Sequence, residues 1–476
     1  MAVGNRRVLP LRYRAEGKAP SVINPFVAWD VWSAGAADAP GLASRQATRL
    51  RGLVAHARTH APFYRDLYRS VGANTARLAD LPPVGKTDLM PQFDRWLTDR
   101  ALSYQKAEAF AADRRRIGEL LEGRWAVWKT SGTSGEMGLF VHDRVALDVY
   151  DALFAGRAGS ALAGSPAALR LASHGGRMAC ILANEDHFAG IASWRHQAET
   201  YPWLAPLMRD FSVMTPMPDL IGQLNAWDPG QLVAYPSVLS LLADEQDQGR
   251  LHLQPGIVIA GGETLEGAEQ ARIERVFGAR VLNVYACSEA DYLAFGCPHG
   301  WLHVNQDWMI LEPVDRDYRP VDPGAASHTV LLTNLANRVQ PVIRYDLHDS
   351  VTVKPEPCPC GNPLTAIRVE GRRNEVLRFT ARDGGDLKIL PLAIGTAIER
   401  VAGLRRYQLV QTAADAVAIR YRSKPGADPP SVGRDAVRAV ADYLGSQGAP
   451  AVSVTASDQP PRPDPVSGKF RAVLPL

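Results

Sequence analysis

The feature that most constrains the fold is an alternation of short β-rich runs with helical patterns between about residues 127 and 353. A helical pattern over residues 268–277 separates two of these runs. Such alternation predicts helices layered on a sheet, so we expect a large α/β domain here. The β-rich runs are GIVIAGGE, VLNVYACSE, HTVLLTNL and PVIRYDLHDSVTV.

The pattern changes after Gly371. YQLVQTAADAVAIRYRS predicts a hairpin, SVGRDAVRAVADYLGSQ an amphipathic helix and AVSVTAS a last strand, together a small α+β unit of about a hundred residues. We therefore predict one domain over residues 1–371 and a second over residues 372–476. Near the start of the chain, helical spacing of apolar residues from Leu42 predicts a helix ending near Pro62 and a second short helix up to Val71.

Composition narrows the class of protein. A chain of 476 residues with 46% hydrophobic and 22% charged residues is long enough for a large core. Acidic and basic residues are mixed, and no Lys/Arg block marks a nucleic-acid partner. The chain has no uninterrupted run of eighteen apolar residues, and its first twenty residues lack an apolar signal segment. We expect a soluble cytoplasmic protein that interacts with neither nucleic acid nor membrane.

A glycine-rich loop follows the apolar WAVW. Its small residues let backbone N–H groups approach a polyphosphate, and its hydroxyls can donate hydrogen bonds. It is not the loop of P-loop NTPases, because no lysine follows the second glycine at the required place. We interpret it as a nucleotide triphosphate site, with an ordinary surface turn as the alternative. The loop is Lys129, Thr130, Ser131, Gly132, Thr133, Ser134 and Gly135.

This loop resembles the first signature of the adenylate-forming superfamily of acyl-CoA synthetases, luciferases and peptide-synthetase adenylation domains. Within that superfamily, Pro62-Phe63-Tyr64-Arg65, LADLPPVGKTDL and YPSVLSLLA are similar to segments of phenylacetate-CoA ligases and related capsule-biosynthesis proteins. The later signatures follow in the family's order: Ala260-Gly261-Gly262-Glu263-Thr264, Tyr285-Ala286-Cys287-Ser288-Glu289, Arg344 to Asp349, Gly371-Arg372-Arg373-Asn374-Glu375 and Ser467-Gly468-Lys469.

The resemblance implies an activity. ATP and a carboxylic acid, expected to be aromatic, would form an acyl-adenylate and pyrophosphate, and the acyl group would then pass to CoA. Lys469, on a mobile C-terminal domain, would bridge the acid and the α-phosphate and leave when that domain rotates. Glu289 would hold Mg²⁺ with the Thr133 hydroxyl nearby. The alternative for Lys469 is a solvated lysine near a chain end.

The resemblance also implies the nucleotide contacts. Tyr285 would stack on adenine, between the turn Gly261-Gly262-Glu263 and its own neighbours Ala286 and Ser288. Asp349 would accept hydrogen bonds from both ribose hydroxyls, since a carboxylate only accepts. Arg372 could reach the ribose or the phosphates. For Glu289 and Asp349, the alternative is a surface carboxylate that caps a turn.

For the acid itself, the resemblance points to the region between the adenine strand and the glutamate motif. The residues that could line this pocket are Tyr235, Ser237, Ala260, Ala286 and Asp291. The alternative for Tyr235 and its neighbours is that they belong to the core.

Four of the five cysteines lie between Cys287 and Cys360, which favours reduced thiols or a metal site over a disulfide framework. Cys297, His303, Cys358 and Cys360 offer soft ligands for a four-coordinate Zn²⁺, and relatives with such segments use this set. We expect a structural zinc, with His299 as the competing imidazole and metal-free thiols as the alternative. Cys180 and Cys287 are interpreted as small buried hydrophobes.

Two departures from the family's pattern leave alternatives open. Glu136 stands in the phosphate loop where many relatives carry a proline and a lysine, and Asn374 occupies the predicted hinge. Besides a CoA ligase, the chain could be an adenylating enzyme that transfers its acyl group to an amine or a carrier-protein thiol. A third possibility is a nucleotide-binding protein without catalysis, against which Lys469 argues. The oligomeric state cannot be read from the sequence, although homodimers are common among the relatives that it resembles.

Overall fold

Helices form the first described part of the chain. The computed structural model describes residues 23–35, 37–72, 77–130, 138–159, 165–370, 377–380, 385–389, 391–424, 426–457, 459–462 and 472–475. The helix expected to end near Pro62 is confirmed, because a residue before proline is steered out of the helical region. The helices here are α1 (Pro25–Gly35), α2 (Ala39–His60), α3 (Pro62–Leu67), α4 (Lys86–Leu89), α5 (Phe93–Trp96) and α6 (Tyr104–Ala112).

A nine-stranded sheet forms the centre of the larger part, in the order β13-β14-β9-β8-β7-β6-β5-β3-β4. The strands from β4 to β7 are parallel, and those from β7 to β13 are antiparallel. The strands are β3 (Met178–Leu182), β4 (Met208–Ser212), β5 (Gln231–Ala234), β6 (Ile257–Gly261), β7 (Arg280–Cys287), β8 (Ala290–Gly296), β9 (Leu302–Val304), β13 (Val351–Val353) and β14 (Ala366–Val369).

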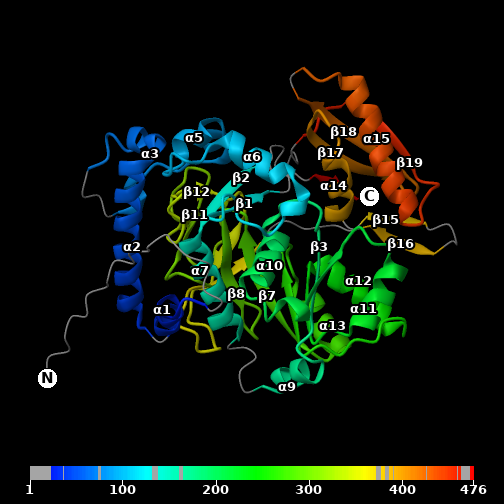
Figure 1. Ribbon diagram of the computed structural model, residues 1–476, viewed down its shortest axis with the longest axis horizontal. Helices are drawn as coiled ribbons and strands as arrows, with labels where there is room; N and C mark the ends of the chain where they lie inside the picture. The colour runs from blue at the N-terminus through cyan, green and yellow to red at the C-terminus, as the bar shows by residue number, and fades with distance from the viewer. Residues whose placement is uncertain are drawn as a thin grey trace.

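Helices pack against the parallel part of this sheet (Figure 1). A parallel sheet is covered on both faces, which explains why β3 and β6 are apolar along almost their whole length. The expected α/β layering is confirmed. These helices are α10 (Ala189–Thr200), α11 (Met217–Trp227), α12 (Pro236–Asp247) and α13 (Gly267–Phe277), whereas α9 (Pro166–Ser173) has no buried residue and lies below the sheet in Figure 1.

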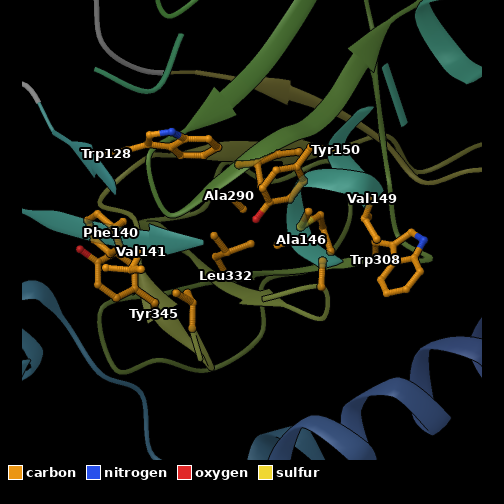
Figure 2. Close-up of a cluster of buried hydrophobic side chains, with 14 of the residues drawn as sticks. Trp128, Phe140, Val141, Ala146, Val149, Tyr150, Ala290, Trp308, Leu332 and Tyr345 are labelled. Atoms are coloured by element: carbon orange, nitrogen blue, oxygen red, sulfur yellow. The ribbon is translucent and has the colours of Figure 1, made fainter. Parts of the chain in front are cut away.

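A second apolar layer forms beside this sheet. A hairpin of β1 (Trp125–Lys129) and β2 (Leu139–Asp143) packs with α7 (Arg144–Leu153) and with a three-stranded sheet, β10 (Met309–Val314), β11 (Thr329–Asn334) and β12 (Tyr345–Asp346). Figure 2 shows their buried side chains converging around Leu332. The rings of Phe140 and Tyr345 meet edge to face, 5.9 Å apart. This core lies directly behind the β7–β8 turn.

The run PVIRYDLHDSVTV differs from its prediction. It forms only the short strands β12 and β13, because Arg344 and His348 have positive φ angles of 49° and 58°. The Asp346 carboxylate accepts hydrogen bonds from Thr329 and from the backbone N–H of His348, and so stabilises the bend. A non-glycine residue rarely adopts positive φ, and apolar periodicity does not report it.

The C-terminal unit has the predicted hairpin, helix and strand. The hairpin β17 (Leu404–Ala413) and β18 (Ala416–Ser423) joins β19 (Ser453–Ser457) and β20 (Val473–Leu474) in a four-stranded sheet that packs on α14 (Pro391–Glu399) and α15 (Pro429–Ser446). A separate hairpin is formed by β15 (Leu377–Thr380) and β16 (Asp386–Ile389). The predicted boundary at residue 371 lies outside the described residues and stays a prediction.

The C-terminal unit, orange in Figure 1, lies beside α11 and α12 of the larger part. The side-chain amide of Gln447 donates to the carbonyl of Met214 over 3.0 Å, and Arg400 forms an ion pair with Glu185. The two parts therefore contact each other through polar groups as well as through apolar side chains. Among the described helices, none is both long and apolar enough to cross a membrane.

Candidate active site

A cavity of about 1670 Å³ opens at the carboxyl ends of β5, β6 and β7. Ligands of open α/β sheets bind at these ends, outside the strands. Arg405 and Arg422 of the C-terminal hairpin line the same cavity, so both parts of the chain contribute to its wall. From the predicted nucleotide motifs, it is lined by Thr130, Gly261, Gly262, Glu263, Tyr285, Ala286, Ser288, Glu289 and Asp349.

The end of β7 carries the aromatic residue of the glutamate motif, and the turn to β8 carries its acidic residue. The Tyr285 hydroxyl donates to Asp349 Oδ2 over 2.9 Å, which joins two motifs that are 64 residues apart. The Glu289 carboxylate is 7% exposed and is hydrogen-bonded to the Tyr345 hydroxyl. Burial, with this carboxylate's charge, raises the pKa of Tyr345, so its hydroxyl stays protonated as a donor. The carboxylate therefore has a fixed orientation at the cavity wall.

A buried network supports this turn from behind. His142 Nε2 lies 3.0 Å from the Ser288 carbonyl, and Nδ1 lies 3.1 Å from the Tyr150 hydroxyl. Burial lowers the pKa of His142 to about 3, so the ring is neutral. The carbonyl can only accept, which places the proton on Nε2 and leaves Nδ1 as an acceptor. Asn334 adds a bond to the Glu289 carbonyl over 3.1 Å. Sequence reasoning missed this network, because nothing local distinguishes His142.

The ends of the glycine-rich loop are held together by the β1–β2 hairpin. Thr130 Oγ1 accepts from the backbone N–H of Gly138 over 2.8 Å and from Lys86 Nζ over 3.0 Å. A side chain at Gly138 would collide with Lys86, since its Cβ would lie 2.7 Å from Cε. Lys86 also lines the cavity. It lies in LADLPPVGKTDL, a segment noted in the sequence for its resemblance to the family and not as a binding site.

Several predicted residues lie outside the described part of the chain. They are the loop residues Ser131, Gly132, Thr133, Ser134, Gly135 and Glu136, the hinge residues Arg372 and Asn374, and Lys469. Their roles stay predictions.

The turn after β6 is shaped by Tyr235. Gly262 has a positive φ of 80°, and a Cβ there would lie 2.9 Å from the Tyr235 ring, so only glycine fits. Glu263 Oε2 accepts from the backbone N–H of Ser237 over 2.9 Å, at the start of α12. An anionic group is favourable at a helix N-terminus. Glu263 therefore fixes α12 against this turn.

The predicted acid-pocket residues separate into two groups. Tyr235, Ala286 and Asp291 line the cavity, whereas Ala260 and Ser237 are buried behind its wall. Asp291 is 5% exposed, and burial raises its pKa to about 7. Cys180 is fully buried as expected, but Cys287 is only half-buried and lines the cavity.

The four predicted zinc ligands come together. One ligand atom from each of Cys297, His303, Cys358 and Cys360 lies within 4.8 Å of all the others. The Sγ atoms of Cys297 and Cys358 are 3.7 Å apart, close to the edge of a tetrahedron with Zn–S bonds of about 2.3 Å. His303 Nδ1 contacts the Leu364 carbonyl over 2.8 Å, which leaves Nε2 to face the thiols. The competing His299 is exposed and outside the cluster.

The comparisons with known proteins concern the fold. No family model and no curated protein matches the sequence. Among solved structures, a benzoate CoA ligase from Burkholderia xenovorans LB400 is 12% identical, with 74% of this chain and 68% of that chain covered and a TM-score of 0.36. 2-Hydroxyisobutyryl-CoA ligase in the postadenylation state, in complex with R3-HIB-AMP, is 21% identical over 90% of this chain and 89% of its own, with a TM-score of 0.49.

The same 2-hydroxyisobutyryl-CoA ligase in its thioesterification state, in complex with 2-HIB-AMP and CoA, matches with a TM-score of 0.55. The identity is 21%, and the match covers 92% of this chain and 90% of that chain. A likeness over nearly the whole length of both chains includes the small C-terminal unit. The chain therefore has the fold of the adenylate-forming ligases, a large α/β part followed by a small α+β part, as its ordered motifs implied.

Proposed function

We propose that the chain joins a carboxylic acid to the α-phosphate of ATP and passes the resulting acyl group to the thiol of CoA. The observation that supports this most is the convergence of the turn after β6, the β7–β8 turn and Asp349 on one cavity. The Tyr285–Asp349 hydrogen bond ties the predicted adenine and ribose contacts together. The similar 2-hydroxyisobutyryl-CoA ligase holds an acyl-AMP and CoA.

The chemistry requires positive charge where two anions meet. A carboxylate is a poor electrophile until it forms a mixed anhydride with phosphate, and its attack on ATP brings like charges together. Lys86, Arg405 and Arg422 line the cavity and lower this repulsion. Lys469 would then bridge the acid and the α-phosphate, as the family resemblance implies. Pyrophosphate is the leaving group.

Glu289 is the proposed ligand of Mg²⁺. Its oxygens are hard donors, which this cation prefers, and the Tyr345 hydroxyl fixes their direction. The ion would neutralise the phosphates next to the β7–β8 turn. Thr130 and Lys86, hydrogen-bonded to each other, hold the near end of the phosphate loop beside this position.

The cysteine and histidine cluster is proposed to hold one structural Zn²⁺. Three thiols and one imidazole match its preferred donors, and the distances fit a tetrahedron. The cluster joins the turn after β8, from Cys297, to the Cys358–Cys360 segment before β14. Its role is to stabilise this side of the large part, because its four residues leave no position for a substrate.

The finer assignment is a soluble, cytoplasmic enzyme of the phenylacetate-CoA ligase type. It is supported by the N-terminal segment from Pro62, by YPSVLSLLA and by the zinc cluster. An amine or a carrier-protein thiol in place of CoA, and a homodimer in place of a monomer, remain alternatives for solution experiments.

The test is pyrophosphate release from ATP and Mg²⁺ across a panel of aromatic and aliphatic acids, with and without CoA. We expect acid-dependent release that Lys469→Ala loses and that Lys424→Ala, an exposed lysine of the same C-terminal part, retains. Formation of acyl-CoA then identifies the acceptor. Release without any acyl-CoA would direct the search to amines and carrier proteins, and no release with any acid would contradict the proposed activity.

A further inference from the structure

Two aspartates lie on one wall of the cavity, held by the same helix. Ser193 and Gln197 are one turn apart on α10. Ser193 Oγ donates to Asp291 Oδ2 over 2.9 Å, and Gln197 Nε2 donates to Asp151 Oδ1 over 3.1 Å. The two carboxyls are therefore held by neighbouring positions on the same face of that helix. All four residues line the cavity that contains the nucleotide motifs.

Neutral groups hold these two carboxyls. Asp151 accepts from Gln197 and, over 2.8 Å, from the Tyr201 hydroxyl. Asp291 accepts from Ser193 and from a backbone N–H. Within the described part of the chain, no lysine or arginine is among the donors to either group.

Two other acids of the molecule are paired with cations. Asp307 is fully buried and paired with Arg157 at 2.8 Å, and Asp186 is paired with Lys129 at 2.9 Å. Burying a carboxylate without a cation is costly. Burial raises the pKa of both Asp291 and Asp151, and the charge of Asp151 raises the pKa of Asp291 further. Asp151 and Asp291 thus differ from Asp307 and Asp186, because they line the cavity and no basic side chain of the described residues is paired with them.

The wall around them suits a hydrocarbon group that ends in a cation. Phe154 and Tyr292 line the cavity with ring centroids 5.1 Å apart, and Ala155 and Ala158 belong to the same wall. Aromatic faces attract cations as well as apolar groups. Asp291 follows Glu289 by two residues, so the acidic wall begins beside the proposed nucleotide site.

We propose that the acid activated by this protein carries a protonated amine, and that Asp151 and Asp291 bind this ammonium group on the cavity wall. The inference rests on the proposed function and adds the substrate class. An ammonium has three donors, enough to reach both carboxyls, and its charge relieves their mutual repulsion. An acid without the amine would leave both carboxyls buried against its hydrocarbon part with no cation.

Matched acids that differ only in the amine test the proposal. The pairs are 4-(aminomethyl)benzoate with 4-methylbenzoate, and 6-aminohexanoate with hexanoate. We expect kcat/KM for pyrophosphate release to favour an amine-bearing member by about 100-fold, because a site built for a polar group rejects the analogue that lacks it. Equal or better activity with the members that lack the amine would overturn the proposal and leave the proposed function intact.

Isosteric variants locate the effect. Asp291→Asn and Asp151→Asn should each reduce the preference to within about tenfold. Asp148→Asn is the matched control, because Asp148 lies on the same helix as Asp151 and is partly buried but does not line the cavity. Asp148→Asn should keep the full preference. A preference that survives in both cavity variants would contradict the assignment of these residues.

A binding measurement separates this inference from the activity. Benzylamine carries the cation without a carboxylate, and benzyl alcohol is its neutral counterpart. Calorimetry should show benzylamine binding to the natural chain at least about tenfold more tightly than to Asp291→Asn, whereas benzyl alcohol should not discriminate. Equal benzylamine affinities would overturn the inference. If no acid releases pyrophosphate but benzylamine discriminates, the proposed activity fails while the cation site stands.

Discussion

The nucleotide half of the cavity takes its side chains from short contiguous segments, whereas the acid half takes them from three separate elements. Tyr285 and Glu289 lie close together in the sequence, at the end of β7 and in the turn after it, but the contacts to Asp291 and Asp151 join residues 98 and 46 positions apart. A phosphate or a ribose needs the same few groups at fixed spacing, and such spacing is visible in a sequence. The groups that select an acid need only meet in space, so they are visible only in the folded chain.

The largest expected effect tests the nucleotide half. Glu289→Gln keeps the size of the side chain and a partner for Tyr345 but removes the charge that Mg²⁺ requires. We expect pyrophosphate release to fall by about 100-fold or more, whatever the acid. Rates at saturating ATP and Mg²⁺ for the panel acids measure it. Loss with one acid only would place Glu289 in the acid half and remove the contrast between the halves.

The same contrast explains how much of the site could be predicted. Asp349 was identified from its motif, and the structure adds that Tyr285 binds it. Asp291 was suggested because it follows the glutamate motif closely. Asp151 and Ser193 were missed, since a single aspartate or serine on a helix is usually solvated and only the packing of α7 and α10 brings them to the cavity.

The next prediction concerns the proposed zinc site, whose cysteine and histidine ligands were predicted from the sequence. Cys358→Ser should lose the proposed zinc and lower the free energy of unfolding by about 3 kcal/mol, because metal binding contributes to folding. Metal content and denaturant unfolding measure the two effects. His299→Ala is the control, since its side chain is exposed and outside the cluster. A Cys358→Ser chain with unchanged stability and metal content would show that these thiols form no metal site.

In the fold, too, elements that depend on the local sequence were predicted, and features that depend on contacts with distant residues were not. The hairpin of β17 and β18, helix α15 and the strand β6 follow from periodicity and were predicted. The bends at Arg344 and His348 were not, because they depend on Asp346 accepting hydrogen bonds from Thr329 and from the chain itself. Periodicity describes which face is buried, and it says nothing of a bend stabilised from another strand.

The acid half can be tested by the pH dependence of the stability difference between the natural chain and Asp291→Asn. The pKa of Asp291 is about 7, above the value of about 3.9 for an unfolded chain, so the folded state binds an extra proton between these values. Its contribution is fully present below about pH 4 and is lost as pH rises through 7. Asn at this position does not titrate. Relative to the natural chain, Asp291→Asn should therefore gain about 3 kcal/mol of unfolding free energy between pH 5 and pH 8.

Denaturant unfolding at the two pH values measures this gain. Asp322→Asn, at an exposed position, controls for the loss of one carboxylate charge from the surface. A stability difference between the natural chain and Asp291→Asn that does not change with pH would mean that Asp291 is charged in the fold without cost. Charging Asp291 in the fold would then cost no free energy, and the proposal that a bound cation offsets this cost would be weakened.

The smallest expected effect lies behind the nucleotide half, where His142 Nε2 donates to the Ser288 carbonyl. His142→Leu removes this donor from a buried carbonyl, at a cost of about 1.4 kcal/mol. We expect KM for ATP to rise about tenfold with a smaller change in kcat, because the turn is displaced while Glu289 and Lys469 remain. His142→Gln restores an N–H donor and should recover most of the affinity. If Leu and Gln behave alike, packing against Trp128 rather than the hydrogen bond positions the turn, and the nucleotide half then depends on distant contacts as much as the acid half does.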